Sequence, residues 1–299
     1  MLSFEKNLFI LYYHEIFSQP IILVSLSITA YAQVHLSAEA SDPQKMEWMQ
    51  GFPPPQDKII SVIDGSAFQF PASRYSVCNM RQFLPTTVVA SAKENQYIFI
   101  VQTDETLDKL TFMPWGSDQP MTWETLLSEN YTDGILILHK GKIVYEKYFG
   151  ALEPEGVHAA MSVSKTFTGT LGALLIAEGV LDENKTAAYY VPELTNSAFD
   201  DASVRQILDM TTALQYSEDY ADPKAKIWTF TMASNPFPKP ADYNGPTNYY
   251  DYLKTVRKNN NHGEVFGYKM VNTDALDWII HVLPAKAFQR WFRRDFGYH

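Results

Sequence analysis

The sequence predicts an α+β fold in which an antiparallel sheet is flanked by helices and accompanied by a helical subdomain. Three observations carry this prediction: a strong β-hairpin pattern, a long helix of small apolar residues after it, and further amphipathic helices with no returning strand. Because the hairpin has so few strands to pair with, we expect the C-terminal strands of the sheet to be missing from this chain.

The bulk composition is that of an ordinary globular protein. The 299 residues are 46% hydrophobic and 19% charged, and the formal net charge is −10. This length allows one large domain or two smaller ones, with a sizeable core. Nucleic acids and anionic membranes bind a basic face, so we expect no nucleic acid as a partner. The composition does not predict an oligomeric state.

The N-terminus has the features of an export signal. Residues 21–30 form an apolar run that is short for a membrane span, and Ala30-Tyr31-Ala32 then gives an A-x-A cleavage pattern. We therefore expect residues 1–32 to be a signal peptide and the mature protein to be periplasmic or secreted, with no stable membrane insertion after cleavage. The stretch before the run mixes acidic and basic residues, so an uncleaved anchor or a cytoplasmic location stays open.

The rest of the chain divides by pattern into two parts. Residues 33–130 are rich in proline, aromatics and turn formers, which predicts an irregular N-terminal segment with short strands. Residues 131–299 form the main, partial domain, and they begin with alternating apolar residues at 134–149 around the turn Lys140-Gly141-Lys142. This alternation about a glycine turn is typical of a β-hairpin.

A helix follows the hairpin in "AAMSVSKTFTGTLGALLIAEG", residues 159–179. Its apolar spacing predicts one buried face, its glycines and alanines allow close packing, and Gly179 suits a left-handed C-cap. The polar residues Ser162, Ser164 and Lys165 occupy its first turn. Further amphipathic helices are predicted in "VRQILDMTTAL" and "YDYLKTVRKN".

Ser162 and Lys165 form an S-x-x-K pair on one helical face. A serine hydroxyl becomes a strong nucleophile when a base removes its proton, and lysine acts as that base where burial and nearby cations lower its pKa. The N–H of Ser162 at a helix start could supply half of an oxyanion hole. The pattern alone is weak, because it also occurs at Ser3–Lys6 and because a serine there can simply be an N-cap.

The full-length stretches "MSVSKTFTGTLGALLIAEGVLDEN" and "YKMVNTDALDWI" make the interpretation more specific. From about residue 115 to the C-terminus, the chain resembles the serine β-lactamase and penicillin-recognising hydrolase superfamily. Within it, the class C-like esterases and the 6-aminohexanoate-dimer hydrolases are the most similar. The resemblance implies a β-lactamase/transpeptidase-like fold and a serine hydrolase that forms an acyl-enzyme on a small amide or ester.

The resemblance also implies roles for single residues. Ser162 would be the acylated nucleophile, Lys165 would accept or relay its proton, and Tyr268 would act first as base and later as acid for the leaving group. A paired lysine and tyrosine titrate as a unit.

Two further positions are assigned to substrate binding. Tyr220 would line the cleft, with surface packing as an equal alternative. Asn272 lies four residues beyond Tyr268, whereas the commoner family pattern places asparagine two residues beyond, where this chain has Met270. This departure favours the dimer hydrolases over β-lactamases as the model for this chain.

One family motif is absent from the chain. No K-T-G, K-S-G or H-x-G triplet follows Tyr268, so the expected second oxyanion N–H is missing and we expect a C-terminally truncated member. Loss of one such donor lowers the rate by about 10²–10³. The alternative to an enzyme is therefore an inactive or non-catalytic member that binds peptide or cell-wall-like ligands.

Neither a cofactor nor a metal is expected. The serine–lysine–tyrosine machinery needs no cofactor, and His139 and His158 lack the spacing of a zinc motif. Cys78, the single cysteine, has no partner for an intramolecular disulfide and is expected to be a small buried hydrophobic residue.

Overall fold

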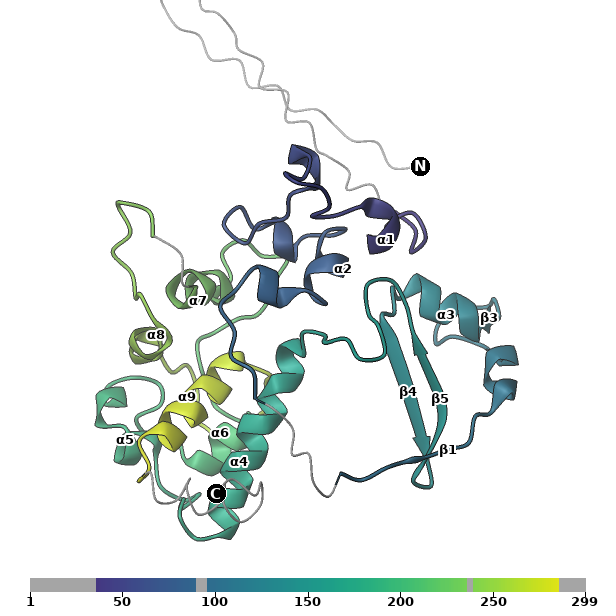
Figure 1. The fold of residues 1–299 in the computed structure, drawn as a ribbon. Helices are drawn as coiled ribbons and strands as arrows, with labels where there is room; N and C mark the ends of the chain where they lie inside the picture. Colours follow the sequence, from purple (N-terminus) through teal and green to yellow (C-terminus); the bar gives the residue numbers. More distant parts are fainter. Residues whose placement is uncertain (1–35, 90–95, 236–238, 285–299) are drawn as a thin grey trace, which may run out of the picture. The chain divides into compact units, whose positions relative to one another are not determined.

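The computed structural model describes residues 36–89, 96–235 and 239–284, and the residues from Ser37 onward belong to one compact unit (Figure 1). The predicted signal peptide, residues 1–32, lies outside the described residues. Among the residues that are described, no helix has both the length and the apolar character needed to cross a membrane.

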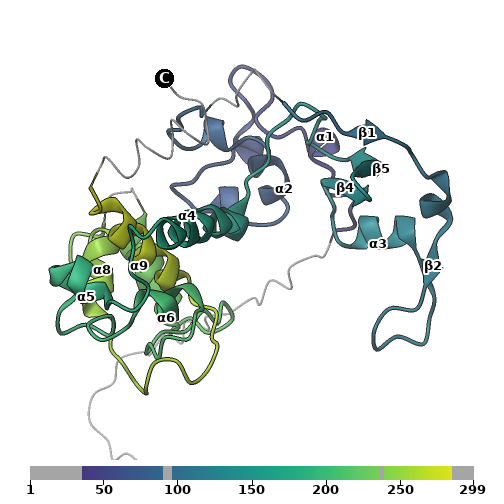
Figure 2. The same cartoon turned by 90° about the horizontal axis from the view of Figure 1, so that it is seen from below.

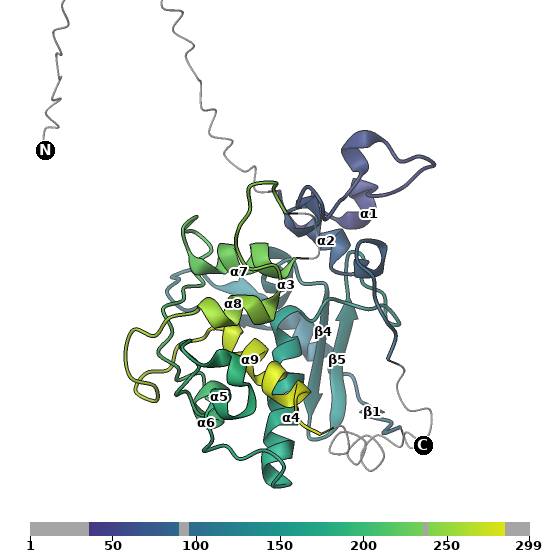
Figure 3. The same cartoon turned by 90° about the vertical axis from the view of Figure 1, so that its left-hand side faces the viewer.

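The main sheet has three strands in the order β1-β5-β4, with bounds Ile100–Val101 (β1), Gly134–His139 (β4) and Lys142–Tyr148 (β5). The predicted hairpin is confirmed, since β4 and β5 pair antiparallel with Gly134 opposite Tyr148. Lys140 and Gly141 form its turn at φ 49° and 76°, the left-handed values that a tight hairpin turn requires. Figure 3 shows the two strands side by side.

The sequence predicted an antiparallel sheet, but one strand pair of the sheet is parallel. The short strand β1 pairs parallel to β5, with Ile100 opposite Lys142. A second pair, β2 (Thr111–Phe112) and β3 (Met121–Thr122), is antiparallel and leads into helix α3 (Trp123–Glu129). In the described residues after β5, no further strand returns to the sheet.

The segment before β1 consists of short helical turns. Their bounds are Pro43–Met46 (α1), Gln56–Lys58 (η1), Ser66–Phe68 (η2), Ser73–Ser76 (α2) and Met80–Gln82 (η3), with Glu105–Lys109 (η4) following β1. A small cluster of Ile60, Ala67 and Ala72 forms their core. Cys78 is buried with a free thiol, as expected, and burial raises its pKa to about 11.

The second half of the unit is a layer of helices. Their bounds are Met161–Ser164 (η5), Lys165–Ala177 (α4), Ala187–Tyr190 (α5), Pro192–Leu194 (η6), Val204–Leu208 (α6), Lys226–Ser234 (α7), Tyr249–Thr255 (α8) and Met270–His281 (α9). Helix α9 lies beside α4, α6 and α8 (Figures 1 and 2). Its buried side chains, among them Val271, Leu276 and Ile279, join Phe199 and Leu253 in the main hydrophobic core.

Helix α4 is less buried than its sequence predicts. Of its thirteen residues only Gly172 and Leu175 are buried, while Ala173, Ala177 and Phe167 are exposed. The close packing predicted for its glycines holds at Gly172, where a Cβ atom would lie 3.2 Å from Leu276 Cδ2 of α9. One face of α4 is therefore fixed against α9, and the opposite face is open.

Helix α6 is shorter than predicted. A capping box at Ser203 and Gln206 starts it, as the polar residues before an apolar run allow. It ends at Leu208, and Met210 then adopts a left-handed φ of 52°. This early end matters for the site, because Met210 and the residues after it anchor the segment that carries Tyr268.

Candidate active site

The predicted nucleophile lies in a tight turn at the start of α4. The Nζ of Lys165 donates a hydrogen bond to the Oγ of Ser162 at 2.9 Å, so the S-x-x-K pair is in contact. Met161, just before the serine, has a left-handed φ of 46°, and the hydroxyl of Ser164 donates to its carbonyl oxygen at 2.6 Å. The turn therefore points the Ser162 hydroxyl outward and the Ser164 hydroxyl back to the main chain.

Tyr268 comes from more than 100 residues away and joins this pair. The Nζ of Lys165 lies 5.8 Å from the centroid of the Tyr268 ring, and the tyrosine is 47% exposed. Its segment is held by the N–H of Gly267, which donates to Met210 O at 2.9 Å, and by Lys269 Nζ, which donates to Thr212 O at 3.1 Å. The fold thus brings all three predicted catalytic side chains to one place.

Tyr220 lies close enough to Tyr268 for the two phenols to interact electrostatically. Its ring packs edge-to-face on Trp228 with 6.0 Å between centroids, and its side chain is largely exposed. Partial burial, together with the neighbouring Glu218 and Tyr268, raises the pKa of the Tyr220 phenol. This position agrees both with a role in lining the cleft and with simple packing on the surface. Contact of Tyr220 with substrate stays a prediction.

Asn272 does not have the position that substrate binding requires. It is fully buried in α9, and its Oδ1 accepts a hydrogen bond from the hydroxyl of Thr212 at 2.6 Å. A side chain with no exposed surface does not touch a substrate, so the structure replaces the predicted binding role with a structural one. The cause is the helical register, which turns the residue two positions beyond Met270 toward the core.

Two acidic residues near the trio were not singled out by the sequence patterns. The carboxylate of Glu218 accepts a hydrogen bond from the N–H of Met270 and so caps α9, where the helix dipole favours a negative charge. Asp274, one turn into α9, is mostly buried, and burial raises its pKa to about 7 although Lys165 opposes the shift. The available signal for Asp274 was its place among the apolar residues of α9, where Ala275 and Leu276 follow it, whereas nothing local marked Glu218.

The raised pKa of Asp274 predicts a pH-dependent stability. The unfolded carboxyl has a pKa of 3.8, so between pH 4 and 7 the folded state holds a proton that the unfolded state lacks. Stability from this group is therefore full at low pH and is lost as the pH rises through 7, where the ionised Asp274 faces Glu218 and Asp277 as well as Lys165. Asp274→Asn should raise the melting temperature at pH 8 and change it little at pH 4.

Calorimetry at both pH values tests this expectation. Asp118→Asn is the control, because Asp118 is exposed between β2 and β3, away from α9. A gain for Asp274→Asn that is equal at the two pH values, or no larger than that of the control, would contradict the assignment.

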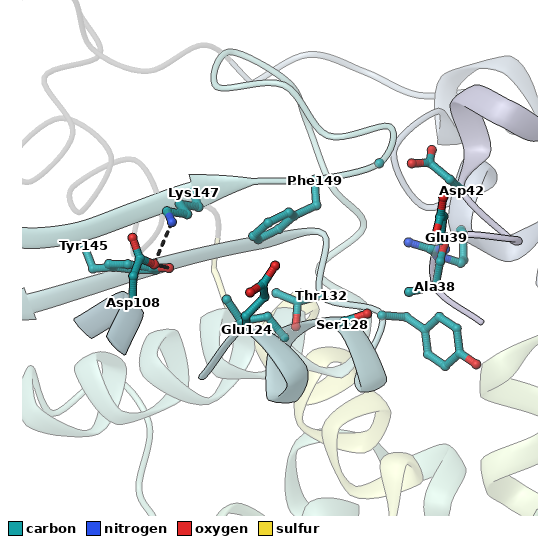
Figure 4. A pocket seen from close by; sticks show the side chains of 14 residues that line it. Ala38, Glu39, Asp42, Asp108, Glu124, Ser128, Thr132, Tyr145, Lys147 and Phe149 are labelled. Atoms are coloured by element: carbon teal, nitrogen blue, oxygen red, sulfur yellow. Dashed lines mark hydrogen bonds and ion pairs between the residues drawn. The ribbon is translucent and has the colours of Figure 1, made fainter. Parts of the chain in front are cut away.

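A separate cavity of about 600 Å³ lies between η4, α3, β5 and the N-terminal segment (Figure 4). In it, Lys147 Nζ and the Tyr145 hydroxyl each donate to Asp108 Oδ1 at 2.7 Å, and Lys147 in particular lowers the pKa of Asp108. Ser162 and Tyr268 do not line this cavity. The proposed catalytic residues at the start of α4 and this cavity therefore lie in different places.

Comparison with known proteins places the chain in a family. The family model described as Beta-lactamase matches residues 130–296, more than half of the chain. The chain belongs to the β-lactamase family. The match includes the hairpin, the S-x-x-K turn and the tyrosine segment, and the mixed α+β fold agrees with it.

Three relatives in this family are informative. A 6-aminohexanoate-dimer hydrolase of Paenarthrobacter ureafaciens is 37% identical over 157 residues, which are 52% of this chain and 39% of the relative. A β-lactamase of Providencia stuartii is 43% identical over 53 residues, 18% of this chain and 14% of the relative. The solved structure of a putative 6-aminohexanoate-dimer hydrolase from Bacillus anthracis has a TM-score of 0.69 and 27% identity, covering 81% of this chain and 62% of that one.

These shares show that the chain spans less than two thirds of each of these relatives. The similarity to both dimer hydrolases confirms the resemblance that the sequence motifs predicted. The fold and the family are established by these comparisons, and the activity of this chain is argued from its own residues.

Proposed function

We propose that this chain is a serine hydrolase that cleaves a small amide or ester through an acyl-enzyme on Ser162. The observation that supports it most directly is the 2.9 Å hydrogen bond between Lys165 Nζ and Ser162 Oγ, with the Tyr268 ring 5.8 Å from the same amine. Covalent catalysis needs a nucleophile within hydrogen-bond reach of a base, with a third group beside that base. Ser162, Lys165 and Tyr268 have this arrangement. Membership of the β-lactamase family adds to this support.

The proposed reaction has two steps. The Oγ of Ser162 attacks the substrate carbonyl carbon and forms a C–O bond, while the bond from that carbon to the leaving nitrogen or oxygen breaks. The hydroxyl proton leaves through Lys165 and Tyr268, and Tyr268 returns it to the leaving group. Water then attacks the acyl-enzyme, which releases the acid and restores the serine hydroxyl.

The developing oxyanion needs hydrogen-bond donors. The N–H of Ser162 lies in the turn that opens α4, where the positive end of the helix dipole adds to its effect. We assign this N–H as one donor to the oxyanion.

We propose a class of substrate, a small amide or ester, and not a single compound. The Paenarthrobacter relative is named for a 6-aminohexanoate dimer, and an amide bond in a small linear molecule suits an open site. The exposed rings of Tyr220 and Trp228 offer an apolar surface next to the trio. On the basis of the predicted signal peptide, we place the reaction in the periplasm or outside the cell.

Covalent labelling tests this function. We expect the purified chain, treated with a fluorophosphonate, to gain the mass of one phosphonyl group, mapped by peptide mass spectrometry to the peptide that contains Ser162. Ser164, two residues away, is an internal control that fragment ions distinguish from Ser162, and it should stay unlabelled because its hydroxyl donates to Met161 O. A chain that binds ligand in calorimetry but forms no adduct, or forms it elsewhere, would support the non-catalytic alternative instead.

A further inference from the structure

Three segments that are distant in sequence meet beside the loop that leads to the nucleophile. Cys78 follows α2, Asp133 immediately precedes β4, and His158 lies in the loop after β5. Their ligand atoms all lie within 4.8 Å of one another. The spacing of the histidines in the sequence gave no hint of this cluster, because its members come from separate segments.

Main-chain hydrogen bonds hold these segments in place. The N–H of Ala159, next to His158, donates to the carbonyl oxygen of Val77, next to Cys78, at 2.7 Å. The N–H of Phe149 donates to the carbonyl oxygen of Asp133 at 2.8 Å. The cluster is therefore built by the backbone and does not depend on chance contacts between long side chains.

The ring of His158 faces hydrogen-bond acceptors on both sides. Its Nδ1 lies 2.9 Å from the carbonyl oxygen of Ala159, and its Nε2 lies 3.1 Å from Asp133 Oδ2. A carbonyl oxygen and a carboxylate oxygen only accept hydrogen bonds, so when Nδ1 donates to Ala159 O the lone pair of Nε2 faces Asp133 Oδ2. A cation between Nε2 and Oδ2 would satisfy both atoms.

The carboxylate of Asp133 is also incompletely satisfied. Its Oδ1 is buried and makes no hydrogen bond in the described structure. The guanidinium of Arg74 donates through Nη1 to Ala38 O and Ser41 Oγ and not to this oxygen. A buried carboxylate oxygen without a partner calls for an ion or a water, and the Cys78 thiol beside it favours a thiophilic ion.

We propose that Cys78, Asp133 and His158 hold a zinc ion, with water as the fourth ligand. Thiolate, carboxylate and imidazole are the ligand types that zinc takes, and in a tetrahedral site its nitrogen and oxygen ligands lie about 3.3 Å apart. The observed 3.1 Å between Nε2 and Oδ2 is close to this value. The bond from Nδ1 to Ala159 O supplies the outer hydrogen bond that orients a metal-bound histidine.

Such an ion would join the nucleophile loop to the rest of the unit. His158 lies four residues before Ser162, Asp133 borders the sheet, and Cys78 belongs to the N-terminal segment. The ion takes no part in the proposed reaction and would act as a structural link. The inference is therefore independent of the proposed hydrolase activity.

Cobalt titration tests the site in the full chain stripped of metal. We expect one Co²⁺ per chain, with a thiolate-to-cobalt charge-transfer band and the visible absorption of a tetrahedral site, both removed by adding Zn²⁺. Cys78→Ser should abolish the charge-transfer band, because the chain has no other cysteine. Asp133→Asn and His158→Gln should each weaken zinc binding by about 100-fold or more in calorimetry.

His139→Gln is the matched control, since His139 is exposed at the end of β4 and lies outside the cluster. It should bind zinc as tightly as the unchanged chain. Exposed His158 can be replaced with little risk to folding, and circular dichroism confirms that each variant is folded. Weak binding without a thiolate band, or equal loss of affinity in His139→Gln and His158→Gln, overturns the proposal.

Discussion

Ser162→Ala is expected to reduce hydrolysis of an activated ester by about 10⁴–10⁶. The Ser162 side chain is exposed and its hydroxyl accepts a hydrogen bond from Lys165, so its loss removes the nucleophile without disturbing the core. The measurement is kcat/KM for a chromogenic ester, together with the melting temperature, which should not change.

Ser164→Ala is the matched control for this experiment. Ser164 lies two residues away, but its hydroxyl donates to Met161 O and is turned toward the main chain. We expect this variant to keep activity within about tenfold. Comparable losses in both variants would show that the turn, and not the Ser162 hydroxyl, limits the reaction. A loss in Ser162→Ala of less than about tenfold would place the nucleophile elsewhere.

Lys165→Met is expected to lower kcat/KM by about 10²–10⁴, the usual contribution of a positioned acid or base. The amine contacts the Ser162 hydroxyl and lies over the Tyr268 ring, so it is the group that connects the nucleophile to the phenol. Methionine keeps the length and the apolar stem of the side chain while removing the amine. Fluorophosphonate labelling of Ser162 should slow by a similar factor.

Lys185→Met provides the comparison. Lys185 Nζ lies 5.1 Å from the centroid of the Tyr189 ring, so it reproduces the lysine–tyrosine contact at a place without a serine nucleophile. We expect this variant to retain full activity. If Lys165→Met kept more than a tenth of the activity, proton transfer through Lys165 would be excluded as a main contribution.

The parts of the fold that follow from local pattern were predictable. The hairpin from 134 to 149 and the helix after Ser162 are encoded by alternation, by the glycine turn and by apolar spacing, all of which act over a few residues. The parallel pairing of β1 with β5 was not, because a two-residue strand leaves almost no pattern and its partner lies about 40 residues away.

The site was predictable for a different reason. Ser162 and Lys165 are neighbours on one helical turn, so their contact follows from spacing, whereas Tyr268 was placed by its resemblance to a family motif. Asn272 was misassigned because the motif gives a distance along the chain but not the face of α9 on which a residue lies. The exposed face of α4 also escaped prediction, since burial depends on tertiary packing that a helical pattern cannot specify.

The hydrogen bond from the N–H of Met270 to the carboxylate of Glu218 connects the segment that carries Tyr220 to the segment that carries Tyr268. Tyr220 follows Glu218 by two residues, and Tyr268 precedes Met270 by two, so one carboxylate restrains both phenols at once. Local opening that breaks this hydrogen bond would free the Tyr220 segment first, because the Tyr268 segment is still held at Met210 and Thr212. Access for a ligand beside Tyr220 can then change while the proton-transfer group Tyr268 keeps its position.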